Sequence, residues 1–298
     1  MSLRFCLFGH PVGHSLSPAI HGGAYRALGL PHRYELVDVP DEAVLATRVR
    51  AIREGAIRGA NVTIPWKRAA LRLSDEVDAS AERVGAANVL SRTASGRVRA
   101  SNTDVEGLAA ELSALAPGAR RVLVLGSGGA ALAAVVAAHV VGARSVAVTA
   151  RRFSADVPRE TWPRAADFTA LGSEVLPWPG ASPNGESDPV AAFASAADIV
   201  VQATSAGMQG KDPGAVVADI VPWSALPSHA VAYDLVYTPP ETEFMLRARE
   251  RGLRAENGLG MLVEQAALAL EIWLDVRAPR AEMRAAAEAE LRARRAAG

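Results

Sequence analysis

The chain has little cysteine and no excess of charge of either sign. Cys6 is its only cysteine, so an internal disulfide and a metal site built from several cysteines are both excluded. Cys6 lies inside an apolar run, and we expect it to be a buried structural thiol rather than a nucleophile. The 32 basic and 32 acidic residues give a formal net charge of zero. This balance argues against broad binding to nucleic acid or to a membrane surface.

Long apolar runs are missing as well. No run approaches the length of a membrane span, and the first residues reach Gly9, His10 and Pro11 too early for a signal peptide. His10, His14 and His21 do not have the spacing of a zinc-binding motif, so we expect no metal. We therefore expect a cytoplasmic protein whose partner is a small molecule. Its 298 residues, half of them apolar, suit two domains of ordinary size.

The strongest motif is a glycine-rich turn near the middle of the chain. The apolar run 121–125 ends in Gly126-Ser-Gly128-Gly-Ala-Ala131, and an alanine-rich segment that favours a helix follows. A dinucleotide-binding βαβ unit needs this order, because the first glycine permits a tight turn and the second lets the backbone approach a pyrophosphate. The pyrophosphate would then lie on the N–H groups at the helix N-terminus. The predicted cofactor loop comprises Gly126, Ser127, Gly128, Gly129 and Ala130.

The strand that follows this turn indicates which dinucleotide is bound. Residues 145–149 are predicted to be the second strand of the unit, where a NAD-binding protein usually carries an acidic residue at the strand end. Here the strand ends in Ala150, Arg151 and Arg152 instead. A carboxylate would repel a 2′-phosphate, whereas guanidinium groups bind it. The pattern favours NADP over NAD, although two arginines after a strand also suit a solvated loop.

Alternating strand and helix patterns predict an α/β fold. The expected strands are residues 4–8, 34–39, 59–64, 86–91, 98–102, 121–125, 145–149, 174–176, 198–202 and 231–237. The expected helices, besides the one after the glycine turn, are residues 19–30, 41–54, most of 66–84, 107–115 and the region from 259 almost to the end. Residues 153–189 are expected to be irregular around the strand 174–176. Residues 280–297 are expected to be an exposed helix or a frayed tail with a solvated, charged face.

Two polar clusters follow predicted strands, where ligands bind in open α/β sheets. One cluster, residues 61–67, contains Thr63 and Lys67 around a strand end broken by proline. The other, residues 101–104, ends in Asp104. A carbonyl that accepts hydride needs a proton source and a positive group near its oxygen, and a lysine held in place by an aspartate supplies both. Taken alone, Lys67 also suits a surface lysine and Asp104 a helix N-cap.

Ser15 and Ser17 form a third polar group, just before the predicted helix 19–30. Two hydroxyls on one side of an extended segment, together with helix N–H groups, can bind a small carboxylate. The simpler interpretation is that Ser17 is an N-cap with Pro18 at the first helical position. The two interpretations are compatible with each other.

The polar clusters and the glycine turn occur in the same order in a known family. The matching motifs are Gly9–Pro18, Asn61–Lys67, Ser101–Asp104, Gly126–Ala130, Ala203–Met208, Tyr233–Pro239 and Gly258–Gln265. Any one of these motifs is common, but the ordered set is specific. The chain closely resembles the shikimate/quinate dehydrogenase family.

The resemblance implies a reversible, NADP-dependent oxidation of shikimate to 3-dehydroshikimate, a step of chorismate and aromatic amino acid biosynthesis. It implies that Lys67 is the catalytic acid–base group, paired with Asp104. It places the substrate carboxylate on Ser15 and Ser17, with help from Tyr237. The ring hydroxyls would be held by Thr63, Asn88, Asp104 and Gln265. The remaining cofactor-binding positions would be Ala150, Arg151, Arg152, Thr204, Leu235, Gly258 and Met261.

The resemblance also implies a domain arrangement. Residues 1–105 and 240–298 would form the substrate-binding catalytic domain, and residues 106–239 a Rossmann-like NADP-binding domain. The C-terminal helices would therefore return to the first domain. The protein would act as a monomer or a homodimer.

The chain departs from the family pattern in three places. Gly22 replaces a common Asn, Val89 replaces a Thr, and in the cofactor segment the usual Asn-Arg-Thr reads Ala150-Arg151-Arg152, with Ala155 in place of the later Arg. The first two leave room for a quinate/shikimate or aminoshikimate dehydrogenase of a specialised pathway, and the third weakens the argument for NADP. A non-catalytic dinucleotide-binding regulator is a third hypothesis, because a fold alone does not establish an activity. Such a regulator is expected to lack the Lys–Asp pair, which this chain retains.

Overall fold

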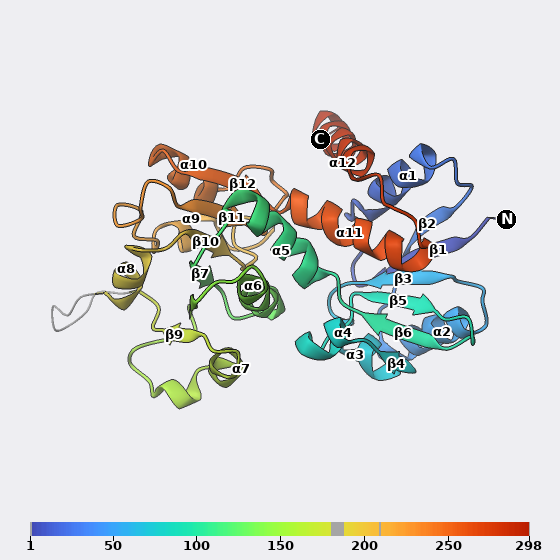
Figure 1. Ribbon diagram of the computed structural model, residues 1–298, viewed down its shortest axis with the longest axis horizontal. Coiled ribbons are helices and arrows are strands. Elements are labelled where there is room, and N and C mark those ends of the chain that lie inside the picture. Colours follow the sequence, from blue (N-terminus) through green and yellow to red (C-terminus); the bar gives the residue numbers. More distant parts are fainter. Residues whose placement is uncertain (1, 180–187, 209, 298) are drawn as a thin grey trace. The chain divides into compact units, whose positions relative to one another are not determined.

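The computed structural model describes residues 2–179, 188–208 and 210–297, in which the chain forms two compact units. The first unit combines Met1–Gly107 with Leu262–Gly298, and the second is Leu108–Met261. Each unit contains one six-stranded sheet with helices packed against it (Figure 1). The α/β fold with C-terminal helices that return to the first unit is confirmed. No helix within the described ranges is long and apolar enough to cross a membrane.

The first sheet has one part that is parallel and one strand that is reversed. Its order is β2-β1-β3-β5-β6-β4. Strand β1 is parallel to β2 and β3, whereas β5 is antiparallel to β3 and β6. The carboxyl ends of β1, β3 and β6 and the amino end of β5 therefore lie at the same edge. The strands are β1 (Arg4–Gly9), β2 (Arg33–Asp38), β3 (Gly59–Val62), β4 (Glu76–Val77), β5 (Val89–Arg92) and β6 (Val98–Ser101).

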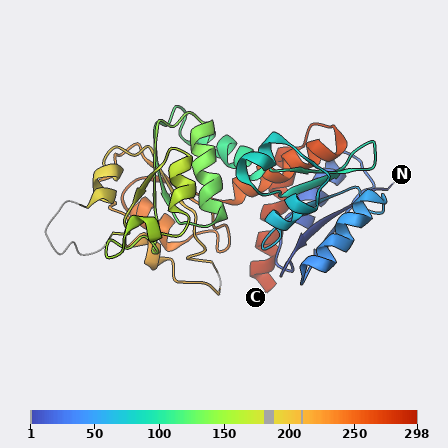
Figure 2. The ribbon, with the colours of Figure 1, turned by 90° about the horizontal axis from the view of Figure 1, so that it is seen from below.

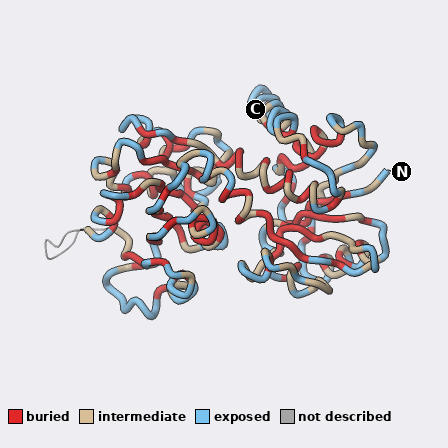
Figure 3. The backbone as a smooth tube through the Cα atoms, in the orientation of Figure 1, coloured by how far each residue is buried: buried red, intermediate tan, exposed pale blue. Residues whose placement is uncertain are grey.

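Helices cover both faces of the first sheet. Cys6 and Phe8 of β1 belong to the core that α2, α3 and α4 complete, while Phe5 packs against α1 and α11. This alternation along β1 follows from the two-residue period of a strand. Many of the buried residues accordingly lie within the strands (Figure 3). The helices of this unit are α1 (Ser17–Ala27), α2 (Glu42–Arg53), α3 (Lys67–Leu73), α4 (Ala79–Val84), most of α11 (Leu259–Leu274) and α12 (Arg280–Ala297). Helix α5 (Asp104–Leu115) begins in this unit and lies mostly in the second.

The second sheet is parallel throughout, in the order β12-β11-β10-β7-β8-β9. Helix α6 contacts β7 and β8, and α8, α9 and α10 contribute to one core with the sheet (Figures 1 and 2). The strands are β7 (Arg121–Leu125), β8 (Ser145–Thr149), β9 (Glu174–Leu176), β10 (Ile199–Gln202), β11 (Val231–Asp234) and β12 (Arg254–Asn257). The helices are α6 (Gly129–Val140), the 3-10 helix η1 (Arg159–Thr161), α7 (Ala165–Ala170), α8 (Pro189–Ala194), α9 (Ala215–Ala218) and α10 (Glu243–Glu250).

We expected the chain to return to the first unit at residue 240, but it returns later. Strand β12 pairs with β11, and α10 packs on both of them, so this region belongs to the second unit. The return falls within α11, at Leu262. The sequence of β12 is Arg-Ala-Glu-Asn, which has one apolar residue and no strand-like alternation. Its place in the sheet depends on backbone pairing with β11.

Two further segments differ from the sequence prediction. Residues 66–84 are mostly helical, as expected, but the helical region is interrupted by β4, which separates α3 from α4 and pairs with β6. Backbone pairing of β4 with β6, which is distant in sequence, overrides the local helical pattern at Glu76–Val77. The segment 153–189 contains the expected strand β9, but it also forms η1 and α7. Its residues 180–187 lie outside the described residues.

The final charged segment is a packed helix rather than a frayed tail. Helix α12 lies against α1, with Met283 and Ala287 fully buried and its charged face exposed (Figure 1). Gly23 of α1 permits this close approach, because a Cβ atom there would lie 2.7 Å from the Cβ of Ala286. The sequence prediction described the polar face correctly and missed the apolar one.

Candidate active site

One edge of the first sheet carries six of the residues predicted to bind or act on the substrate. After β1 come Ser15 and Ser17, after β3 come Thr63 and Lys67, after β6 comes Asp104, and immediately before β5 comes Asn88. Because β5 runs opposite to its neighbours, its amino end lies beside the carboxyl ends of β3 and β6. Carboxyl ends of parallel strands are where open α/β sheets bind ligands. The topology therefore gathers residues that are distant in sequence.

Lys67 and Asp104 form an ion pair at this edge. Lys67 begins α3 and Asp104 begins α5, and the distance between Lys67 Nζ and Asp104 Oδ2 is 2.6 Å. The lysine side chain is 31% exposed and the aspartate side chain 15% exposed. The amine can therefore meet a ligand from solvent, while the carboxylate holds it by a charge-assisted hydrogen bond.

Buried polar side chains fix the direction of the Asp104 carboxylate. Asn88 Nδ2 donates to Asp104 Oδ1 at 2.9 Å, and Asn88 Oδ1 accepts from the Thr103 N–H at 2.8 Å. Thr103 Oγ1 donates to the Gln265 carbonyl at 3.0 Å, and Asn88 Nδ2 lies 3.4 Å from Gln265 Oε1. Asn88, Thr103 and Gln265 are all buried. Each carboxylate oxygen of Asp104 thus has its own donor, so the ion pair has little freedom to rotate.

The two serines form a hydroxyl pair at the start of α1. Ser15 Oγ donates to Ser17 Oγ at 3.0 Å and accepts from the Ser17 N–H at 3.1 Å. The alternative prediction that Ser17 is the N-cap is wrong, because α1 begins at Ser17 and its N-cap is Leu16, which makes no side-chain cap. Ser15 satisfies the first helical N–H instead. The hydroxyls are therefore held together beside the positive end of a helix.

The glycine turn of the second unit has the predicted geometry. Gly126 follows β7 with a φ of +131°, and Gly128 is the N-cap of α6. A Cβ atom at Gly126 would lie 3.0 Å from the Ala203 carbonyl oxygen, so the turn requires glycine. Gly128, Gly129 and Ala130 are exposed, and a Cβ on either glycine would meet nothing within 4 Å. The N–H groups that begin α6 are therefore open to an anion.

Two exposed arginines follow the neighbouring strand β8. Ala150 is buried, and Arg151 and Arg152 are exposed directly after it. Arg151 Nη2 lies 2.5 Å from Asp212 Oδ2, in a pair whose side chains are 56% and 50% exposed. The arginine predicted to bind the phosphate therefore already has a carboxylate partner, which comes from the loop after β10. This partner was not predicted from the sequence.

The other predicted cofactor positions lie at the ends of β10 and β11 and at the start of α11. The Thr204 N–H donates to Gln202 Oε1 at 2.5 Å, which fixes the turn after β10. A Cβ on Gly258 would lie 2.3 Å from the Leu235 carbonyl oxygen, so only glycine allows these two segments to approach. The Met261 N–H donates to the Tyr233 hydroxyl at 3.3 Å. These contacts hold the predicted positions within the second unit.

A buried acid shapes the turn after β11. Burial raises the pKa of Asp234 to about 6, although the Thr242 hydroxyl and the Val236 N–H both donate to its carboxylate. These hydrogen bonds order the segment that leads to Tyr237, which lies in the second unit. The role of Tyr237 toward the substrate stays a prediction.

Cys6 and His21 are buried and uncharged at neutral pH. Burial raises the pKa of the Cys6 thiol to about 11 and lowers the pKa of His21 to about 3. The structural role expected for Cys6 is consistent with its complete burial. His21 stacks on Tyr34, with ring centroids 4.2 Å apart. Across the described ranges, no group of three His, Cys, Asp or Glu residues is arranged to hold a metal ion.

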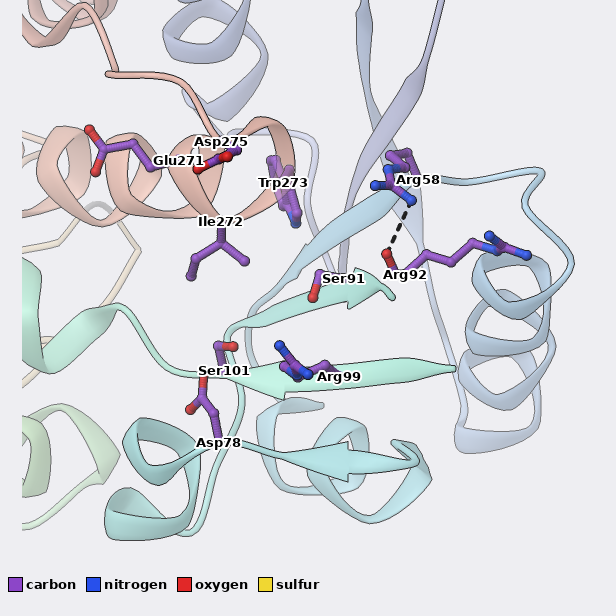
Figure 4. Close-up of a pocket in the computed structure, with 10 residues that line it drawn as sticks. All are labelled: Arg58, Asp78, Ser91, Arg92, Arg99, Ser101, Glu271, Ile272, Trp273 and Asp275. Carbon is purple, nitrogen blue, oxygen red and sulfur yellow. Dashed lines mark hydrogen bonds between the residues drawn. The ribbon is translucent and has the colours of Figure 1, made fainter. Parts of the chain in front are cut away.

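A separate polar hollow of about 420 Å³ lies in the first unit (Figure 4). Its lining residues, which include Arg58, Arg99 and Trp273, contain none of the predicted substrate positions. Arg58 donates to the Arg92 carbonyl, and Arg99 pairs with Glu76 at 2.8 Å. The cations of this hollow are therefore satisfied within the protein, and it is distinct from the edge that carries Lys67.

Residues of the segment 101–104 other than Asp104 also shape the site, which we did not predict from the sequence. Asn102 and Thr103 also matter, because Asn102 Oδ1 accepts from the Asp104 N–H at 3.0 Å and Thr103 holds Asn88 and Gln265. The sequence does indicate this role, because polar residues between a buried strand and a helix are needed to hydrogen-bond unpaired backbone groups. Arg294, which contacts the segment of Ser15, had no local signal.

Comparisons with known proteins identify the family. Residues 7–90 match the shikimate dehydrogenase substrate binding domain, and residues 258–288 match the shikimate 5′-dehydrogenase C-terminal domain. The chain is 40% identical over 295 residues to the shikimate dehydrogenase (NADP(+)) of Rhodopseudomonas palustris strain HaA2. That alignment covers 97% of this chain and 96% of the relative.

Solved structures give the same result. The shikimate 5-dehydrogenase of Thermus thermophilus, in complex with NADP(H) and shikimate, is similar with a TM-score of 0.80 and 36% identity, covering 96% of this chain and 98% of that one. The ligand-free 5-ketofructose reductase of Gluconobacter sp. strain CHM43 is similar with a TM-score of 0.79 and 29% identity, covering 97% and 98%. The fold therefore occurs in enzymes named for two substrates. On identity over nearly the whole length, the chain belongs to the shikimate dehydrogenase family.

Proposed function

We propose that the Lys67 site oxidises shikimate to 3-dehydroshikimate and catalyses the reverse reduction, with NADP as the cofactor. The chain is an NADP-dependent oxidoreductase that acts on a CH–OH group, and its reaction is a step of aromatic biosynthesis. The observation that supports the assignment best is the distance of 2.6 Å between Lys67 Nζ and Asp104 Oδ2, at the edge where the serine pair also lies. We expect the enzyme to work in the cytoplasm as a monomer or homodimer.

Lys67 is proposed to move the proton of the reacting hydroxyl. In oxidation its amine accepts that proton, and in reduction its ammonium returns the proton to the carbonyl oxygen. The ammonium also stabilises negative charge that develops on this oxygen. Asp104 holds the amine, and Asn88 holds Asp104. NADP, when bound, supplies the acceptor or donor of the hydride.

The remaining substrate contacts divide by chemistry. Ser15 and Ser17 are proposed to donate to the carboxylate, because their hydroxyls lie beside a helix N-terminus. Tyr237 is proposed to assist them. Thr63, Asn88 and Gln265 are proposed to bind the ring hydroxyls, since amide and hydroxyl groups both donate and accept.

The second unit fits a dinucleotide phosphate. The exposed N–H groups at the start of α6 suit the pyrophosphate, which would contact Gly126, Ser127, Gly128, Gly129 and Ala130. Arg151 and Arg152, beside Ala150, are proposed to hold the 2′-phosphate. The nicotinamide side is proposed to be lined by Thr204, Leu235, Gly258 and Met261.

Initial rates measured at the absorbance band of reduced nicotinamide test this function. Shikimate and quinate are each paired with NADP⁺ and NAD⁺, and 5-ketofructose is tested with NADPH. We expect fast turnover only for shikimate with NADP⁺. Comparable efficiency with quinate or NAD⁺ would move the chain to the broader quinate/shikimate class. Turnover of 5-ketofructose, which has no carboxylate, would contradict the proposed role of Ser15 and Ser17.

The contact between Arg151 and Asp212 predicts how removal of the Asp212 charge changes the KM for NADP⁺. The Asp212 carboxylate occupies the guanidinium that a 2′-phosphate needs, so Asp212→Asn is expected to lower the KM for NADP⁺. Because the pair is exposed, the expected change is modest, about two- to fivefold. The KM for NAD⁺ and the kcat are expected to stay unchanged.

Asp219→Asn is the matched control for Asp212→Asn. Asp219 is an exposed acid of the same unit, and it pairs with Arg247 at 3.3 Å. Its replacement makes the same change in net charge and is expected to leave the KM for NADP⁺ unchanged. An equal effect of both substitutions would assign the change to overall charge rather than to competition at Arg151.

A further inference from the structure

An arginine of the last helix reaches the segment that carries the serine pair. Arg294 Nη1 donates to the His14 carbonyl at 2.7 Å, and Arg294 Nη2 donates to the Ser15 carbonyl at 3.1 Å. Arg294 Nε donates to Glu290 Oε1 at 2.7 Å, one turn earlier on α12. Each nitrogen of this guanidinium thus makes a defined contact, and two of the contacts join α12 to a main chain about 280 positions earlier.

These contacts restrain the backbone on both sides of Ser15. The His14 carbonyl belongs to the peptide unit before Ser15, and the Ser15 carbonyl belongs to the unit after it. The Ser15 N–H also donates to the Val12 carbonyl at 3.0 Å. Since each peptide unit is planar, holding both units fixes φ and ψ of Ser15. The direction of its side chain, and so its contact with Ser17, follows from these angles.

The position of α12 is itself well defined. Its buried residues Met283 and Ala287 pack against the first unit, and Ala286 lies against Gly23 of α1. Arg294 lies two turns further along the same helix. The guanidinium is therefore presented from a packed element rather than from a free tail.

We propose that Arg294 is a positioning residue for the binding of the substrate carboxylate. It holds the main chain around Ser15 so that the serine pair meets the carboxylate without rearrangement, and such preorganisation increases affinity. This inference rests on the proposed function, in which Ser15 and Ser17 bind the carboxylate. It predicts an effect on substrate binding and little effect on the chemical step.

Steady-state kinetics of Arg294→Ala in the full-length enzyme test the proposal. The KM for shikimate is expected to rise about five- to tenfold, as for the loss of charge-assisted hydrogen bonds. The kcat is expected to change by less than about twofold, and the KM for NADP⁺ to stay unchanged. Arg294→Lys keeps the charge without the planar fork, so an intermediate KM is expected. A lower kcat together with a lower melting temperature and an unchanged KM would show a structural role and overturn the proposal.

Arg292→Ala is the matched control. Arg292 lies on the same helix and faces Glu288 at 3.9 Å, four residues earlier, but its side chain is 70% exposed. The two substitutions remove the same charge from the same turn. The control is expected to keep the wild-type KM for shikimate, and an equal rise in KM would overturn the proposal.

A double-mutant cycle with Ser15→Ala separates this inference from the proposed function. If Arg294 acts through Ser15, the double variant is expected to have the same KM for shikimate as Ser15→Ala alone. If its KM instead rises by the product of the two single-variant factors, the inference is overturned. If Ser15→Ala leaves the KM for shikimate unchanged, the carboxylate site of the proposed function fails. If Ser15→Ala raises the KM and Arg294→Ala does not, only the role of Arg294 fails.

Discussion

Replacing Lys67 with alanine is expected to lower kcat by about two to four orders of magnitude in both directions of the reaction. The substitution removes the group that exchanges a proton with the reacting oxygen and the charge that stabilises that oxygen. Asp104 keeps Asn88 as a donor, so the fold is expected to survive. Initial rates with shikimate and NADP⁺, compared at equal protein concentration with the melting temperature, measure the effect. A kcat within about tenfold of the wild type would remove Lys67 from the mechanism.

Two further variants separate proton transfer from charge. Lys67→Arg keeps a cation beside Asp104, but a guanidinium does not give up its proton, so the loss is expected to persist. Arg68→Ala removes a cation from the next position of α3, where the side chain is exposed, and is expected to leave kcat unchanged. Recovery of Lys67→Ala activity by a small primary amine in solution would assign the loss to the missing acid–base group.

Replacing Trp273 with alanine is expected to lower the free energy of unfolding by about 3–5 kcal/mol, as for other large aromatic residues in cores. Trp273 is 5% exposed, and its indole stacks on Phe5, with ring centroids 4.8 Å apart. Its Nε1 donates to the Leu90 carbonyl at 3.1 Å, in the middle of the first sheet. A Cβ on Gly59 would lie 2.4 Å from the same nitrogen, so β3 leaves room for this ring. The substitution therefore opens a cavity and leaves the Leu90 carbonyl without its side-chain donor.

Ile272→Ala is the control for Trp273→Ala, because Ile272 precedes it on α11 and is 42% exposed. Its loss is expected to cost less than about 0.5 kcal/mol, as for most surface changes. Trp273→Phe keeps an aromatic ring and removes the donor, so an intermediate cost is expected. Urea denaturation followed by circular dichroism measures each variant, with amide exchange of β1 and β3 reporting on the first unit. Equal stability of Trp273→Ala and Ile272→Ala would contradict this account of the core.

The parts of the fold that could be predicted are those with local causes. The turn at Gly126 requires glycine because β7 must turn tightly into α6, and the sequence shows this as an apolar run followed by closely spaced glycines. The polar residues around Lys67 and Asp104 follow buried strands, so their position at a sheet edge was also accessible. The order of the strands in the sheet explains why the side chains of Lys67 and Asp104 meet. Their spacing in the sequence alone does not predict this contact.

The parts that could not be predicted depend on contacts between distant segments. Strand β12 has a polar sequence and exists because β11 offers it backbone partners, which moved the return to the first unit from residue 240 to Leu262. The pairing of Arg151 with Asp212 and the reach of Arg294 to Ser15 leave no periodic pattern in the sequence. A charged residue looks the same in sequence whether it is solvated or holds a main chain in place.

The division of the first unit between the two ends of the chain has a consequence for synthesis. The second unit is one continuous segment, Leu108–Met261, and it is complete before α12 has been translated. Ribosomes add about 5–20 residues per second, so the first sheet, which is complete at Ser101, waits roughly 9–35 seconds until α11, which ends at Leu274, has been made. During that interval Phe5 has no indole to stack on, and the surface beside Gly59 stays uncovered. A nascent chain at this stage therefore presents an apolar sheet face of the kind that chaperones bind, until α11 covers it.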